Sequence, residues 1–456
     1  MSLHPELAEL INRLSTLETR VTRIEQSALV IAEAQKGQLA LLSDLQNRVG
    51  DKEREQLAAR IFGGLEKASL IYPKEKTIIY VGRDYFGDNV KYAYLDMVAR
   101  AREAGVQCYY LTHDQRQYDL LTGAGLPCLP VALTEWTTAH MHIMLSASVA
   151  VLGSIFYPSN EQKRLYWSLL RGAKTVQLWH GLPLKAIGME CLYTPATFGP
   201  QTAEILAASG PFDIFVGTSQ VSKDAWARRF NFHRFEAVGY PRMDALSRPA
   251  TPHDLLNVDT DSLHAMEADH FHNHPVILYA PTFRDHKLGT WLHDVGLDQV
   301  AANAAEKSYA VYVNLHPFEA AILPELQARY PALRFIRPET DIYPLLRQVD
   351  VLVTDYSSLT FDFLPLDKPI VHFCPDHDSY IANARPLVSG YEKLLAGPVV
   401  STTGELSTAL EAVLSASQND VATAYIELRN NLRRYLFDHS DGKASSRVSN
   451  CTISLT

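Results

Sequence analysis

At 456 residues, the chain is long enough for two or three domains with separate cores. Its 47% apolar and 20% charged residues are typical of a globular protein and exclude collagen-like, disordered and membrane-spanning classes. The net charge of -9 argues against general nucleic-acid binding, which relies on a basic surface. The start of the chain has no basic and apolar leader pattern, so a cytoplasmic location is expected.

The first fifty residues carry a heptad pattern. Apolar residues recur at spacings of four and three from residue 3 to residue 49, and only Gln35 and Gln38 interrupt them. This pattern predicts a left-handed coiled coil that joins copies of the chain into a homo-oligomer. An amphipathic helix packed on its own domain or on a membrane surface is the alternative.

The next part of the chain alternates predicted strands with helices, which indicates a parallel sheet. The strands are expected at residues 77–81, 106–111, 147–152, 175–179 and 214–218. His180 follows the fourth of them on a Gly/Pro turn, in the sequence WHGLPLK. A histidine in that position can accept a proton near neutral pH, although a purely structural histidine is also compatible with the pattern.

A polar segment over residues 251–274 is rich in Pro, Asp and His and is predicted to link two domains. Just before it, the turn GYPRMD offers Arg242 as a cation. On an extended backbone His270, His272 and His274 would line up as metal ligands. No Cys or carboxylate accompanies them at a fixed spacing, so a solvated linker is favoured and no metal site is predicted.

A second set of strands follows, at residues 276–279, 309–314, 333–336, 349–353, 370–373 and 398–400. Two α/β domains that face each other across a cleft are therefore expected. Arg284 follows the first strand of this set and a proline turn, which suits it to bidentate contact with phosphate. His316 follows the second strand and is exposed by the proline after it.

The most informative segment is VDVLVTDYSSLTFDF, residues 349–363. A buried strand ends in a cluster of helix-capping residues, 354–358, and a helix is predicted from 359 to 366. A helix start at the carboxyl edge of a parallel sheet presents unpaired N–H groups to an anion. The segment therefore predicts a phosphate site, with simple helix capping by Asp355 and the serines as the alternative.

Several motifs, taken in order, resemble those of the CDP-glycerol glycerophosphotransferase family, the teichoic-acid primases and polymerases. The resemblance covers about residues 80–448 and is carried by FGDNVKYAYL, WHGLPLK, GYPRMD, YAPTFRD, NLHP, TDYSSLTFDF, GPVV and DGKASSRV. It implies a GT-B-type fold of two Rossmann-like, doubly wound domains. It also implies transfer of a polyol phosphate, most often glycerol 3-phosphate, from a CDP-activated donor to a hydroxyl of a growing polymer, with release of CMP.

The residue patterns and the resemblance together predict an order of domains and a set of site residues. The expected domains are an N-terminal helix (1–60), an acceptor domain (61–250), the linker and a nucleotide-donor domain with C-terminal helices (275–456). His180 and His316 correspond to the catalytic histidines. The donor side is expected to contain Pro281, Thr282, Arg284, Asp355, Ser357, Ser358, Asp362 and Lys443. The acceptor side or cleft is expected to contain Asp88, Asn89, Gly181, Lys185 and Arg242.

The residue chemistry favours His180 as general base, with His316 and Arg284 stabilising the diphosphate and the departing CMP. Asp355 is expected to orient its loop, and Asp362 to reach a donor hydroxyl. No cofactor is predicted, and the need for a divalent ion is open. Leu182 and Met243 depart from the family pattern, which leaves the polyol and the acceptor open.

Two other functions remain alternatives. A GT-B glycosyltransferase or sugar-nucleotide epimerase would share the fold, and a non-catalytic scaffold would use the coiled coil alone. A lipid-linked acceptor would bring the chain to the cytoplasmic face of a membrane as a peripheral protein. The basic residues that would meet anionic lipid are Lys163, Arg164, Arg171, Lys174, Arg429, Arg433 and Arg434.

Overall fold

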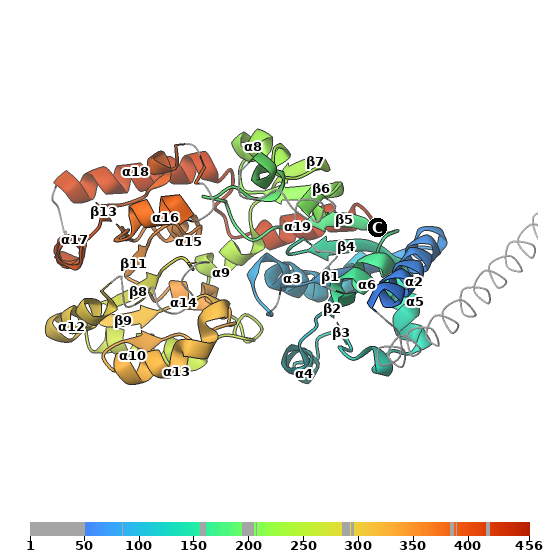
Figure 1. The fold of residues 1–456 in the computed structure, drawn as a ribbon, viewed down its shortest axis with the longest axis horizontal. Coiled ribbons are helices and arrows are strands. Elements are labelled where there is room, and N and C mark those ends of the chain that lie inside the picture. The colour runs from blue at the N-terminus through green and yellow to red at the C-terminus, as the bar shows by residue number, and fades with distance from the viewer. Residues whose placement is uncertain are drawn as a thin grey trace, which may run out of the picture.

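The computed structural model describes residues 51–456 apart from 84, 156–160, 194–204, 207, 285–291, 293–295, 384–386, 389 and 416–419. The predicted heptad segment, residues 3–49, lies outside this part of the chain. The described residues form two α/β domains, each built on a parallel β-sheet (Figure 1). The predicted fold class is confirmed in this respect.

The first domain contains a seven-stranded sheet in the order β3-β2-β1-β4-β5-β6-β7. Its strands are β1 (Glu75–Val81), β2 (Gln107–Leu111), β3 (Cys128–Leu129), β4 (Ala147–Leu152), β5 (Lys174–Gln177), β6 (Phe212–Gly217) and β7 (Phe232–Ala237). Its helices are α2 (Asp51–Ile71), α3 (Asp88–Ala104), α4 (Gln115–Gly123), α5 (Thr138–Ser146), α6 (Glu161–Leu169), α8 (Lys223–Ala227) and α9 (Asp244–Ser247). The sequence did not predict β3 or β7, and β5 ends two residues earlier than expected.

The second domain contains a six-stranded sheet in the order β10-β9-β8-β11-β12-β13. Its strands are β8 (Val276–Ala280), β9 (Ala310–Val313), β10 (Arg334–Phe335), β11 (Val351–Thr354), β12 (Ile370–Phe373) and β13 (Val399–Val400). Its helices are α10 (Thr260–Phe271), α12 (Leu297–Lys307), α13 (Leu323–Arg329), α14 (Tyr343–Leu346), α15 (Leu359–Phe363), α16 (His377–Asn383), α17 (Thr403–Ser415) and α18 (Asp420–Leu436).

Both sheets reverse their strand order at one place. In the first sheet the reversal lies between β1 and β4, and in the second sheet it lies between β8 and β11. In a doubly wound sheet, ligands bind outside the carboxyl ends of the strands at this reversal. The loops that follow β1, β4, β8 and β11 are therefore where a site is expected.

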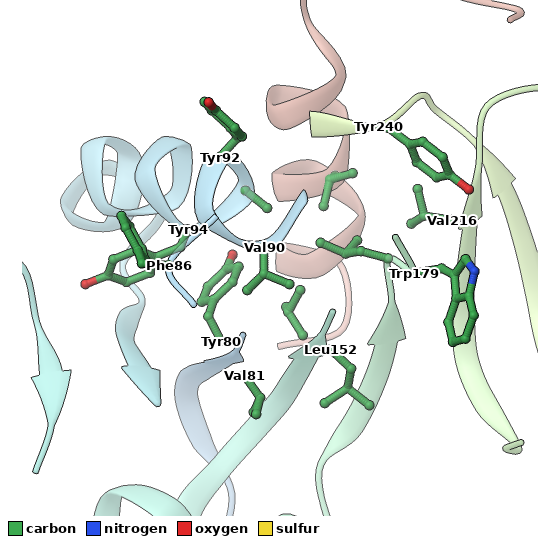
Figure 2. Close-up of a cluster of buried hydrophobic side chains, with 14 of the residues drawn as sticks. Tyr80, Val81, Phe86, Val90, Tyr92, Tyr94, Leu152, Trp179, Val216 and Tyr240 are labelled. Carbon is green, nitrogen blue, oxygen red and sulfur yellow. The ribbon is translucent and has the colours of Figure 1, made fainter. Parts of the chain in front are cut away.

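The core of the first domain lies between α3 and the sheet (Figure 2). Val90 on α3 and Leu152 at the end of β4 are fully buried, and Trp179 and Tyr240 are buried at the β6 side of the same cluster. α3 ends at Gly105, which caps the helix in the left-handed conformation with φ of +64°. This packing fixes the start of α3, where Asp88 and Asn89 lie.

Part of the predicted linker is a helix. α10 begins after Asp259, whose carboxylate accepts a hydrogen bond from the Ser262 N–H at 3.3 Å, and it packs on β8 and α14 of the second domain. His270 lies in α10, and His272 and His274 follow in a turn. The extended backbone that would align three imidazoles is therefore absent from this segment.

The last helix, α19 (Ala444–Ile453), belongs to the first domain rather than the second. It packs on α3, and Figure 1 shows it in red among the blue and green elements of that domain. The N–H groups of Ala444 and Ser445 donate to the carboxylate oxygens of Asp244 at 2.9 and 2.8 Å. The chain thus returns to its first domain, which corrects the predicted grouping of all C-terminal helices with the donor side.

A buried lysine joins the two domains. The Lys91 ammonium donates to the carbonyl oxygens of Asp254 and Leu256 at 2.6 and 2.8 Å and to Asp341 at 2.7 Å. Tyr92 donates to the same carboxylate at 2.6 Å. Because all three acceptors are needed to compensate a fully buried ammonium, this cluster fixes α3 against the second domain.

The residues proposed for membrane contact differ in exposure. Arg429 is 5% exposed on α18, so it does not face an anionic surface. Arg171, Lys174 and Arg434 are exposed. In the part of the chain that the structure describes, every helix is too short or too polar to cross a bilayer.

Candidate active site

His180 lies just past the carboxyl end of β5, beside the strand reversal of the first sheet. Its imidazole stacks on the ring of Trp179, with centroids 4.0 Å apart and planes 29° apart. Its Nδ1 atom is buried and has no hydrogen-bond partner among the described residues. Such a nitrogen is a position where a ligand or water can bind.

The charge state of His180 follows from its surroundings. Burial is the largest cause of a lowered pKa, and the positive charges of Arg83 and Arg242 act in the same direction. Asp88 and the backbone of Gly153 oppose the shift, and the resulting pKa is about 3. The imidazole is therefore neutral at pH 7. A neutral imidazole is the form that can accept a proton.

Two arginines share one carboxylate beside His180. Arg242 donates to Asp88 Oδ1 at 2.6 Å, and Arg83 donates to Asp88 Oδ2 at 3.3 Å. Burial opposes the ionisation of Asp88, but the two guanidinium groups outweigh it and lower its pKa. Asn89 accepts a hydrogen bond from the Arg242 N–H at 3.3 Å. Asp88, Asn89 and Arg242 are thus brought together, as their assignment to one side of the site predicts.

Arg242 also reaches across to the second domain. Its guanidinium donates to both oxygens of Asp362 on α15, at 2.9 and 2.7 Å, and Tyr343 donates to the same carboxylate at 2.7 Å. All of these side chains are buried. Both Asp362 oxygens are occupied by protein donors, so the structure gives this carboxylate a place in the domain contact rather than at a donor hydroxyl.

Arg284 is likewise occupied by carboxylates. It is 2% exposed and donates to both oxygens of Asp376 at 2.8 Å and to Asp355 at 2.8 Å. Its guanidinium lies 4.5 Å from the ring centre of Tyr380. The predicted bidentate contact with phosphate is therefore replaced by a bidentate contact with Asp376, which lies 92 residues away in the chain.

Asp355 ties together the loops that follow β8 and β11. One of its oxygens accepts hydrogen bonds from the N–H groups of Thr282 at 2.8 Å and Tyr356 at 2.6 Å, and the other accepts from Arg284. Pro281 is buried beside this junction. The Thr282 hydroxyl is buried without a partner among the described residues. Asp355 therefore shapes the strand reversal of the second sheet.

Ser357, Ser358 and His316 line the same edge of the second sheet. Ser357 and Ser358 are partly exposed, and Ser357 Oγ accepts a hydrogen bond from the Leu359 N–H at 3.2 Å. α15, which they precede, has only five residues. His316 follows β9 and stacks on Phe283, with ring centres 4.9 Å apart.

The turn after His180 touches this serine loop. A Cβ atom on Gly181 would lie 2.9 Å from Ser358 Oγ and 3.2 Å from Arg242 Nη2. A few residues further on, Lys185 forms an antiparallel bridge with Leu387 of the second domain. The histidine turn of the first sheet and the serine loop of the second sheet therefore lie in direct contact.

This contact leads to a prediction for Gly181→Ala. The glycine has φ of +141°, which L-residues rarely adopt, and the new methyl group would overlap Ser358. We expect a loss of stability on the order of 1–3 kcal/mol and a lower turnover rate, measured by urea unfolding and by product release. Gly123→Ala is the control because its Cβ would meet nothing within 4 Å. Wild-type stability and turnover of Gly181→Ala would show that the turn can accommodate a methyl group.

Lys443 does not share the contacts of the site residues described above. It is exposed, its N–H donates to Asp441 at 3.2 Å, and it precedes α19 on the first domain. Its neighbours in the chain contact α9. The contacts of this segment therefore lie in the first domain rather than at the serine loop.

Sequence reasoning missed four side chains that the structure places at the site. They are Arg83, Tyr343, Asp376 and Gln177. Arg83 alone had a usable signal, because it follows β1 at the strand reversal, where an arginine suits an anion. The others act through partners distant in sequence, which spacing does not reveal.

The described residues contain no group of three His, Cys, Asp or Glu side chains that could hold a metal ion. Asp88 and Asp362 are both engaged by Arg242.

Comparisons with known proteins show the family to which the chain belongs. Residues 65–454 match the family described as CDP-Glycerol:Poly(glycerophosphate) glycerophosphotransferase. The chain is 27% identical over 280 residues to "Teichoic acid poly(glycerol phosphate) polymerase" of Bacillus spizizenii, which covers 60% of this chain and 69% of that protein. It is 28% identical over 283 residues to "Teichoic acid glycerol-phosphate transferase" of Staphylococcus aureus, with the same coverage.

Solved structures of the wall teichoic acid polymerase TagF have the same fold. One variant of that protein superimposes with a TM-score of 0.67 at 19% identity, over 92% of this chain and 97% of that one. The two-domain arrangement is thus shared, including the GT-B-like pairing of parallel sheets.

Proposed function

Because the chain belongs to the CDP-glycerol:poly(glycerophosphate) glycerophosphotransferase family, we propose that it transfers glycerol phosphate from CDP-glycerol to a hydroxyl group of a teichoic-acid-type polymer. The acceptor oxygen attacks the phosphorus that carries glycerol. The bond from this phosphorus to the bridging oxygen breaks, and CMP leaves with the electron pair. The products are the extended polymer and CMP.

One observation carries this proposal, namely the contact between the Gly181 turn and Ser358. It brings a neutral histidine of the first domain beside the serine loop of the second. Phosphoryl transfer needs a positioned hydroxyl, a proton acceptor and a polar environment for the phosphate oxygens. We infer that the acceptor enters from the side of His180 and the donor from the side of Ser357 and Ser358.

His180 acts as general base in this mechanism. Its unpaired Nδ1 is a candidate for the proton-accepting atom, because it is buried without a partner among the described residues. The transferred proton charges the imidazole, and Asp88 stabilises that charge while the donor phosphates neutralise the arginines. His316 and the hydroxyl groups of Ser357 and Ser358 bind the diphosphate.

Arg83 is the arginine best placed to meet phosphate oxygens directly. Its side chain is 31% exposed and forms an ion pair with Asp88 at 3.3 Å. The guanidinium groups of Arg242 and Arg284 are buried and each contacts two carboxylates. Their role is to hold the two strand reversals in place, whereas the guanidinium of Arg83 is left to bind the substrate.

The pH dependence of turnover should reveal this arrangement. In the free protein the pKa of His180 is about 3, and the diphosphate of bound donor adds negative charge that raises it. The acid limb of kcat, which reports the complex, is therefore expected at higher pH than the acid limb of kcat/KM, which reports the free protein. In steady-state assays from pH 4 to pH 9, kcat is therefore expected to show an acid limb, while kcat/KM, whose limb lies near pH 3, stays level. Coincident limbs would contradict the role of the phosphates.

A donor screen tests the proposed function. Purified full-length protein is incubated with a poly(glycerol phosphate) acceptor and either CDP-glycerol, CDP-ribitol or a UDP-sugar, and nucleotide release is measured. CMP formed from CDP-glycerol supports the proposal, and CMP from CDP-ribitol alone would change the polyol. Turnover of the UDP-sugar without CMP release would show a glycosyltransferase or epimerase. No turnover of any donor would favour the scaffold.

Self-association through residues 3–49, peripheral contact with the cytoplasmic face of a membrane, and a lipid-linked acceptor stay predictions. Exposed Arg171, Lys174 and Arg434 support contact with an anionic partner, and Lys174 already pairs with Asp213 at 2.9 Å. The same proposal makes the first domain the acceptor side and the second domain the donor side.

A further inference from the structure

The residue before His180 has an unusual backbone conformation. Trp179 has φ of +53°, in the left-handed region, which bulky residues seldom occupy. Such a conformation persists only where the surrounding structure determines it, and it clusters at functional sites. The interactions that hold Trp179 therefore bear on the placement of His180.

Two buried side chains hold the peptide groups of Trp179. Its N–H donates to Gln177 Oε1 at 2.9 Å, and its carbonyl accepts from Asn89 Nδ2 at 3.0 Å, with a second contact from the same nitrogen to the Leu178 carbonyl at 3.4 Å. Gln177 and Asn89 are both 0% exposed. The donor and the acceptor of this residue are thus both satisfied without a strand partner.

Each of these side chains is itself anchored. Gln177 donates through Nε2 to the Ser154 carbonyl at 3.1 Å, in the loop after β4. Asn89 accepts through Oδ1 from the Arg242 N–H at 3.3 Å, and it lies at the start of α3. The conformation of Trp179 is therefore set by the end of β5, the loop after β4 and the start of α3, which meet at the strand reversal of the first sheet.

The left-handed turn determines where the imidazole lies. In a continuing strand, the side chains of residues 179 and 180 would point to opposite faces. Here both rings lie on one side and stack at 4.0 Å. The indole is fixed in turn by Phe230, with ring centres 4.6 Å apart, and Figure 2 shows it beside Val216 of β6.

We propose that Asn89 and Gln177 are positioning residues, which hold Trp179 in its left-handed conformation and so aim the His180 imidazole at the acceptor hydroxyl. The inference rests on the proposed function for the role of His180. Asn89 is the asparagine of the FGDNVKYAYL motif, and this role does not require it to contact the substrate. A misplacement of about 1 Å at a reacting group can lower a rate by about 10²-fold.

Asn89→Asp and Gln177→Met test the proposal. The aspartate keeps an oxygen for the Arg242 N–H but has no donor for the two carbonyls, and the methionine keeps the chain length but has no acceptor for the Trp179 N–H. We expect kcat to fall by about 10- to 10²-fold while KM for CDP-glycerol changes less than about threefold. Full-length protein is used throughout.

A spectroscopic readout separates positioning from general damage. The Cε1 proton of His180, assigned by its loss in His180→Gln, is expected at an upfield NMR shift because the imidazole stacks on the indole ring. Both variants should move this resonance downfield. Ser69→Ala is the matched control, because Ser69 is also 0% exposed and bonds two backbone groups, the Leu169 carbonyl at 2.6 Å and the Gly172 N–H at 3.0 Å.

The outcomes are distinguishable. If folded Asn89→Asp and Gln177→Met keep the wild-type His180 resonance and kcat, as Ser69→Ala is expected to do, the proposal is overturned. If Asn89→Asp does not fold, Asn89→Ser and Gln177→Met give the same decision. If wild-type protein releases no CMP from any CDP-polyol, the proposed function fails, and the resonance positions still show whether the two residues place His180.

Discussion

Replacing His180 with alanine is expected to lower kcat by about 10²- to 10⁴-fold, because general base catalysis contributes about that factor. The fold should survive, since the imidazole is partly exposed and its Nδ1 has no partner among the described residues. KM for CDP-glycerol should change little, because the serine loop binds the donor. Initial rates of CMP release over a range of donor concentrations measure both constants.

His233→Ala is the control for this experiment. His233 is exposed on β7, at the edge of the same sheet. Its replacement should leave both constants unchanged. A His180→Ala variant that retains kcat within about threefold of wild type would remove His180 from the role of base, since even the weakest effect expected is about 10²-fold.

Replacing Arg242 with alanine is expected to have the largest effect on stability. The guanidinium neutralises Asp88 and Asp362, which are each 4% exposed, and its loss leaves Asp362 without its cation and Asp88 with Arg83 alone. Removing one partner of a buried ion pair costs about 3–5 kcal/mol. Urea unfolding at pH 7 measures the difference.

Two further variants show whether the loss of stability comes from the ion-pair network. Arg116→Ala removes an arginine that is 80% exposed and pairs with Asp114, so it should cost less than about 1 kcal/mol. Adding Asp362→Asn to Arg242→Ala removes one uncompensated charge and should recover part of the loss. If Arg242→Ala is no less stable than Arg116→Ala, the ion-pair network does not hold the two domains together.

The architecture was predictable where burial leaves a strong local pattern. β4 and β11 are buried along their whole length, so they read as continuous apolar runs. β7 was missed because apolar and polar residues are mixed in its sequence, FHRFEA, and each is half-buried or exposed at the edge of the sheet. β3 has two residues, too few for any periodicity. The helix α10 was hidden by the His and Asp residues that made its segment resemble a linker.

The candidate site was predictable as a set of residue types but not as a set of contacts. The position of Arg284 after a strand predicted contact with an anionic ligand. In the structure its guanidinium instead pairs with the carboxylate of Asp376. The partners of Arg242 lie 154 and 120 residues away, at Asp88 and Asp362. Local patterns show which groups carry charge, whereas only the tertiary fold shows which of these groups form ion pairs with one another.

The return of α19 to the first domain has a consequence for biosynthesis. Domains generally fold as units during synthesis, starting from the N-terminal one. Here Arg100 on α3 donates to Ser446 and Asn450, and Asp244 accepts from the first N–H of α19, so these contacts of the first domain span 200 to 350 residues of chain. Such long-range contacts close slowly. On the ribosome, the first domain can therefore be completed only after the whole second domain has been translated.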